Sequence, residues 1–241
     1  MKNSRNKIGK ILINNNTYIM LLVLLIICAI ISPDFFTVQN ITNLVRQYSG
    51  TTIVCMGMLY VILTGGIDLS VGSIVALGSV MVAWSLTTKD LGMAAAIIMP
   101  LLCGVCCGAV TGFFVAFTNM APFVASLAMM TIARGVAYVV SNGQPVQTPA
   151  NTIGTLGIAK LGGVIPWLAI IALIFVLVFW FIIKYTSFGR IVIAIGSNED
   201  AVRLAGIRTK WYKLAVYAIS GLCSGMAGIV AASRTAIGTP I

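Results

Sequence analysis

Long apolar stretches separated by short polar segments dominate the sequence. A helix needs about 20 residues to cross a lipid bilayer, and seven of the stretches approach or exceed this length. They are Tyr18–Ile31, Tyr48–Leu63, Val71–Leu86, Leu91–Phe117, Phe123–Val140, Val164–Ile183 and Leu214–Ala232. The pattern predicts an all-α polytopic membrane protein with about seven transmembrane helices, all within one transmembrane domain over residues 1–241. It also predicts loops at Pro33–Gln47 and Ser141–Gly163 on the outer side and at Lys184–Lys213 on the inner side.

One interruption, from Gly65 to Ser73, combines glycines with polar residues between two apolar stretches. Gly65 and Gly66 favour the end of one helix, and Asp68 and Ser70 favour the start of the next. Irregular backbone at membrane depth persists only where protein buries it or a water-filled cavity hydrates it. A charged Asp there costs about 2.5–3.5 kcal/mol on insertion scales. The break therefore marks either a translocation path or a tight hairpin at one surface.

Glycines at a spacing of four residues predict close contacts between helices. The fourth stretch carries Gly104, Gly108 and Gly112, and the seventh carries Gly221 and Gly225. Such a stripe lets two helix backbones approach more closely than larger side chains permit. We therefore expect both stripes to lie against other helices.

Composition agrees with a position in the bilayer. Apolar residues make up 59% of the chain and charged residues 8%, against roughly 45–50% and 25% in soluble domains. The net charge of +10 is concentrated at the N-terminus and in one loop, so it reflects membrane topology rather than nucleic-acid binding. No nucleic-acid partner is expected.

The distribution of basic residues predicts the orientation. With seven spans and a cytoplasmic N-terminus, ten basic residues lie inside and four outside, as the positive-inside rule requires. The inner ones are Lys2, Arg5, Lys7, Lys10, Lys184, Arg190, Arg203, Arg208, Lys210 and Lys213. In this orientation the Gly65–Ser70 break lies toward the cytoplasmic side.

The sequence offers few groups for chemistry. It has no histidine, and its six cysteines lie within apolar stretches, where packing is their usual role. We expect no catalytic residue, metal or cofactor. An intramembrane enzyme would lack a general base. An ion-coupled secondary transporter with its site at residues 65–73 remains an alternative, because broken helices also form ion sites at the bilayer midplane.

A short helix is predicted within the inner loop at Lys184–Lys213, which we call the charged loop. Ser197 or Asn198 is suited to cap it, and Glu199 and Asp200 follow in the first turn, where the helix dipole favours anions. The remaining features are a small apolar face and a terminating glycine, at Ala201, Leu204, Ala205 and Gly206. Such a helix needs a groove on a partner, or it lies on lipid headgroups.

Several motifs together resemble one family of transport proteins. Gly65-Gly66-Ile67-Asp68-Leu69-Ser70-Val71-Gly72-Ser73 is similar to the signature of the permease subunits of ABC importers of the ribose/xylose/arabinose type. The cytoplasmic loop of that family resembles the segments Thr186–Arg190, Gly196–Asn198 and Ala201–Ile207. Ala125–Leu127 and Thr131–Gly135 in the fifth span also resemble it.

The resemblance implies a cell-membrane subunit that translocates a monosaccharide delivered by an extracytoplasmic binding protein. Its partners would be two cytoplasmic ATP-binding cassette subunits and a second permease copy, identical or different. The loop at residues 184–213 would transmit closure of the ATPases through Ser197–Gly206. The family has about ten spans, so we expect the chain to lack the last three or so, to leave the Gly221/Gly225 face short of a partner helix, and to be unable to transport alone.

Candidate residues of the translocation path are Gly66, Asp68, Ser70, Asn119 and Arg134. Each also has a structural interpretation. Cap geometry alone accounts for Asp68, and Arg134 can extend to the membrane surface or pair within the bundle. The sequence does not identify the sugar.

Overall fold

The computed structural model describes residues 16–149 and 152–240, in two units, residues 1–44 and 45–241. The basic segment Lys2–Lys10, on which the predicted orientation partly depends, lies outside the described residues.

The first unit contains α2 (Asn16–Ile31) and the beginning of α3 (Val38–Leu63). The prediction of a loop over Pro33–Gln47 is wrong, because α3 already begins at Val38. The hydroxyl oxygen of Thr37 accepts a hydrogen bond from the backbone N–H of Asn40 at 3.3 Å and caps the helix.

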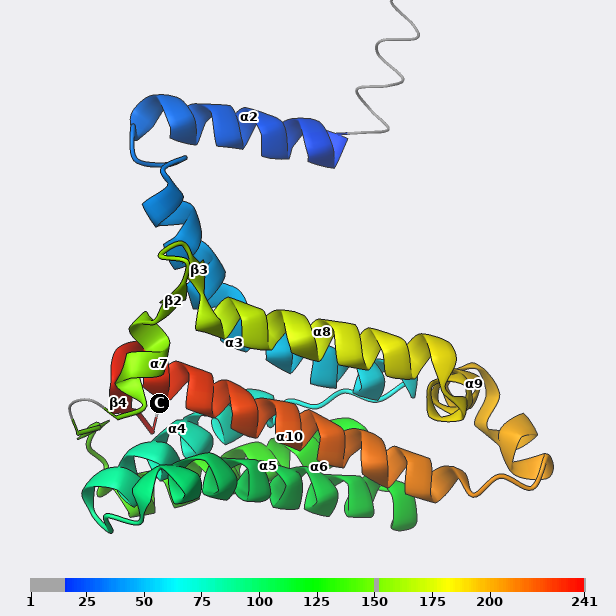
Figure 1. Cartoon of the computed structure of the whole chain (residues 1–241). Helices are drawn as coiled ribbons and strands as arrows, with labels where there is room; N and C mark the ends of the chain where they lie inside the picture. The colour runs from blue at the N-terminus through cyan, green and yellow to red at the C-terminus, as the bar shows by residue number, and fades with distance from the viewer. Residues whose placement is uncertain (1–15, 150–151, 241) are drawn as a thin grey trace, which may run out of the picture. The chain divides into compact units, whose positions relative to one another are not determined.

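The second unit is a bundle of helices (Figure 1). After the remainder of α3 come α4 (Val71–Thr87), α5 (Gly92–Phe117), α6 (Pro122–Ser141), α8 (Trp167–Tyr185), α9 (Ser187–Leu204) and α10 (Thr209–Thr235). Among the described residues, α5, α6, α8 and α10 are long and apolar enough to cross a membrane, and α2 and α4 are shorter apolar helices. The expected class, an all-α polytopic membrane protein, is confirmed.

The centre of the bundle is the contact between α5 and α10, which run side by side (Figure 1). Gly104 and Gly108 lie so close to α10 that a Cβ at either would overlap the carbonyl oxygen of Gly221 or Tyr217. Conversely, a Cβ at Gly221 or Gly225 would overlap a carbonyl oxygen of α5. The predicted close contact of both stripes is confirmed, and the expectation that the Gly221/Gly225 face is short of a partner is wrong, since α5 itself packs on it.

A second set of buried side chains joins α3 to α8. The hydroxyl of Tyr60 donates a 2.8 Å hydrogen bond to the carbonyl oxygen of Phe179, and the two rings meet edge to face at 5.3 Å. Both residues belong to the largest buried apolar cluster, which also includes Val192 of α9 and Tyr217 of α10. The end of α3 is thus attached to the helices on either side of the charged loop.

The segment between α6 and α8 lies at the C-terminal end of α10. It contains β1 (Val146–Gln147), α7 (Gly154–Ile158), β2 (Lys160–Leu161) and β3 (Ile165–Pro166). β1 pairs antiparallel with β4 (Ile237–Gly238), and β2 pairs with β3 through a turn at Gly162 and Gly163. This hairpin delays the start of the sixth predicted span from Val164 to Trp167. The seventh span starts earlier than predicted, at Thr209 instead of Leu214.

We expect Gly108→Leu to lower the stability of the bundle, because the new side chain would collide with the backbone of α10 at Tyr217. Overpacking of this kind costs about 1–3 kcal/mol. The measurement is the thermal unfolding midpoint in detergent. Gly135→Leu is the matched control, since Gly135 lies in α6 with no atom within 4 Å of the added Cβ. Equal midpoints for the two variants would contradict the close contact.

Candidate translocation and coupling sites

The break between α3 and α4 lies inside the bundle. It begins where α3 ends at Leu63, whose carbonyl oxygen is packed directly against Gly196 of α9. Gly65 turns the chain with φ +76°. The segment then passes beside α10, and Asp68 meets Ser220, near the middle of that 27-residue helix. Asp68 therefore lies beside the middle of a helix that is long and apolar enough to cross a membrane.

The carboxylate of Asp68 is fully buried and is held by hydroxyl and amide donors. Its Oδ1 accepts hydrogen bonds from the backbone N–H of Ser70 at 3.0 Å and from the hydroxyl of Ser70. Its Oδ2 accepts one from the hydroxyl of Ser220 at 2.9 Å. The local bonds fix the turn that precedes α4, and the third bond ties the break to α10.

Position 66 favours glycine because the side chain of Tyr217 approaches it closely, and not because of an unusual backbone angle. A Cβ at this position would lie 2.5 Å from the hydroxyl oxygen of Tyr217. Tyr217 is buried, and its hydroxyl has no hydrogen-bond partner among the described residues. Tyr217 and Ser220 were not among the predicted site residues. Their helical spacing within an apolar stretch gave no signal that they face the break.

The structure brings together three of the five predicted path residues. Gly66, Asp68 and Ser70 share the break, whereas Asn119 occupies the exposed turn after α5, with φ +56°. Arg134 lies on an exposed part of α6, where the described residues provide it with no ion pair.

The charged loop is mostly helical. α9 runs from Ser187 to Leu204 and has a kink at Asn198, whose φ and ψ are −160° and 96°. The side-chain oxygen of Asn198 accepts a 3.0 Å hydrogen bond from the backbone N–H of Ala201. Asn198 is therefore the cap of the second half, while the hydroxyl of Ser197 donates to the carbonyl of Ile193. The chain leaves the helix at Gly206, with φ +83°.

The second half of α9 is attached to α10 through Glu199. Its carboxylate forms an ion pair with Lys213 and accepts a 3.1 Å hydrogen bond from the hydroxyl of Thr209. Burial raises the pKa of Glu199, but the hydrogen bond and charge of Lys213, then Thr209 and the charge of Arg203, outweigh it, so the pKa lies below its usual value. Glu199 is consequently ionised at neutral pH.

The second half of α9 has an exposed side as well as the side that is attached to α10. Val202 is buried against the bundle, whereas the small apolar face formed by Ala201, Leu204 and Ala205 is exposed. Leu204 is 87% exposed. A capped helix with a free apolar face and an anchored polar face therefore projects from the end of the bundle.

A bundle of long apolar helices, with a buried break between two of them and a projecting helix at one end, is the architecture of a polytopic membrane protein. A family profile described as "Branched-chain amino acid transport system / permease component" matches residues 40–241. The ribose import permease protein of Haemophilus influenzae is 38% identical, over 100% of this chain and 76% of its own length. The D-allose and L-arabinose transport system permease proteins of Escherichia coli are 34% and 37% identical, over 93% and 97% of this chain and 69% and 70% of theirs.

The chain therefore belongs to this family of transport permeases, and the family resemblance drawn from the sequence is confirmed. It spans about 69% to 76% of the length of these three relatives. No solved structure matches the chain.

We expect Ser220→Ala to destabilise the protein, because it removes a donor from the buried carboxylate of Asp68. Leaving such a group short of a partner costs about 1–3 kcal/mol. Ser224→Ala is the control, since Ser224 is equally buried in α10 and, among the described residues, its hydroxyl bonds within its own helix. Thermal unfolding in detergent is measured for each single variant at Ser220 and Asp68 and for the double variant Asp68→Ala/Ser220→Ala. The comparison gives the coupling energy between the two side chains. Independent effects of the two substitutions would show that the bond does not connect the break to α10.

Proposed function

We propose that the protein is the membrane-spanning subunit of an ABC importer that carries a monosaccharide. Support comes from relatives whose names specify ribose, D-allose and L-arabinose, three sugars of similar size and hydroxyl chemistry. An extracytoplasmic binding protein delivers the sugar to the permease. The permease lies in the cell membrane with its N-terminus in the cytoplasm and works with a second permease copy, identical or different.

ATP hydrolysis is carried out by a separate cytoplasmic subunit. The sequence contains no Gly-x4-Gly-Lys-Ser/Thr segment, which is the loop that holds ATP phosphates in such enzymes. The permease accordingly needs a surface on which the ATP-binding subunits act. The loop at residues 184–213 provides it through residues Ser197–Gly206.

The observation that carries this proposal is the mechanical connection from α9 to the break. Glu199 attaches the second half of α9 to Thr209 and Lys213 at the start of α10. Further along α10, Ser220 holds Asp68. The first half of α9 reaches the same break from its other end, where Gly196 packs against Leu63. A displacement of α9 therefore acts on both ends of the segment that contains Asp68.

The break forms part of the translocation path. Gly66, Asp68 and Ser70 place a carboxylate and a hydroxyl beside the middle of α10. Hydroxyl donors hold the carboxylate, so a sugar hydroxyl can take the place of one of them without a change of charge. Arg134 and Asn119 stay candidates for other parts of the path.

Ala205→Arg is expected to abolish co-purification of the permease with its co-expressed ATP-binding subunit, because a large charged side chain would occupy the exposed apolar face. Insertion into the membrane should be unaffected. Ala94→Arg provides the control, since Ala94 is an exposed alanine near the start of α5, whereas the end of α5 at Phe117 lies beside α9. Normal co-purification of the Ala205 variant would place the docking surface elsewhere.

Transport itself is tested by uptake of labelled ribose, D-allose and L-arabinose into cells that express the permease with its ATP-binding and binding-protein partners. We expect uptake of at least one of these sugars, and loss of uptake when the ATP-binding subunit is inactivated. Uptake that persists without that subunit would favour the ion-coupled alternative.

A further inference from the structure

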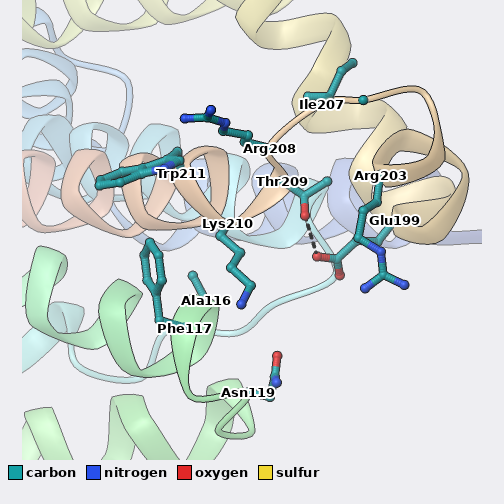
Figure 2. Close-up of a pocket in the computed structure, with 11 residues that line it drawn as sticks. Ala116, Phe117, Asn119, Glu199, Arg203, Ile207, Arg208, Thr209, Lys210 and Trp211 are labelled. Atoms are coloured by element: carbon teal, nitrogen blue, oxygen red, sulfur yellow. Dashed lines mark hydrogen bonds between the residues drawn. The ribbon is translucent and has the colours of Figure 1, made fainter.

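A pocket of about 390 Å³ opens at the end of the bundle where α5 ends and α10 begins. Figure 2 shows the side chains that line it, with Phe117 and Trp211 on one side and Glu199 and Arg203 on the other. Lys210 extends between these two groups. Both α5 and α10 are long enough to cross a membrane, so the pocket lies at the level of the membrane surface.

The charges around the pocket leave a positive excess. Glu199 is paired with Lys213, and Arg203 is paired with Asp200 at 2.9 Å. Arg208 and Lys210 are exposed, and the described part of the chain offers neither an ion-pair partner. Lys210 instead places its ammonium group 5.7 Å from the centre of the Phe117 ring. The pocket therefore presents two uncompensated cations to an anion.

An aromatic strip connects the pocket to the membrane-facing surface of α5. The rings of Phe113 and Phe117 stack at 5.3 Å, and those of Phe117 and Trp211 meet edge to face at 5.4 Å. Phe113 is 48% exposed and Trp211 is 57% exposed. Aromatic side chains of this kind gather where hydrocarbon meets headgroups. A ligand at the pocket can thus extend along an apolar surface into the bilayer.

We propose that this pocket binds the headgroup of an anionic phospholipid. The headgroup phosphate lies at Lys210, beside Phe117, and Arg208 contributes a second positive charge on the other side of the start of α10. An acyl chain follows the strip from Trp211 to Phe113. The two cations together with the aromatic strip favour a lipid over a soluble anion, because a soluble anion has no acyl chain to contact the exposed aromatic strip. The proposal does not depend on which solute the permease transports.

The test uses the full chain in nanodiscs of phosphatidylcholine with increasing phosphatidylglycerol, with retained lipid measured by native mass spectrometry. The variant is Arg208→Gln/Lys210→Gln. Since each basic residue near the surface raises affinity for anionic lipid about fivefold, removal of two should lower the preference for phosphatidylglycerol about 25-fold. The matched control is Lys184→Gln/Arg190→Gln, which removes two exposed charges near the end of α8 and in α9, outside the pocket.

Loss of the preference in the pocket variant alone, with an unchanged unfolding midpoint in phosphatidylcholine, supports the proposal. An equal loss in both double variants would show general attraction to basic residues and overturn it. Inorganic phosphate that displaces the retained lipid would overturn it in favour of a soluble anion. A pocket variant that keeps its lipid preference but no longer co-purifies with the ATP-binding subunit would assign the pocket to that protein.

Discussion

The close approach of α5 and α10 is the constraint on which the rest of the bundle depends. Inside a membrane, lipid solvates apolar side chains as well as protein does, so helices associate through packing rather than through the hydrophobic effect. Glycines on both helices let the backbones touch, from Gly104 to Gly112 on α5 and at Gly221 and Gly225 on α10. This contact fixes the position of Ser220, which lies one residue before Gly221, and so fixes the site that receives Asp68.

Asp68 is a buried carboxylate to which the described residues offer no ion pair, so it needs other stabilisation. Three hydrogen bonds from Ser70 and Ser220 provide it for Asp68. The same residue therefore has two functions in the fold, since it fixes the start of α4 and attaches the break to α10. The break thus lies where local backbone geometry and long-range packing coincide.

Much of this architecture follows from the sequence, for physical reasons. Unbroken apolar length predicts the helices, and glycine spacing predicts which faces touch. Asp68 and Ser70 reveal their local bonds, because a cap involves neighbours in the chain. Ser220 and Tyr217 could not be found in this way, since a serine or tyrosine in an apolar helix does not show which distant segment it faces. The early start of α3 was missed because the polar residues after Thr37 resemble a loop, although that threonine caps a helix.

The glycine contact between α5 and α10 also determines which parts of the molecule can move. Because backbone meets backbone along several turns, the two helices behave as one rigid body, and sliding one past the other would force carbonyl groups into Cα atoms. Rearrangement is then restricted to hinges at the borders of that body. Gly65 lies at the start of the break, Asn198 divides α9, and Gly206 separates α9 from α10. All three positions adjoin the segments that connect the charged loop to Asp68, so a movement of that loop relative to Asp68 would require changes in these connections and not in the contact between α5 and α10.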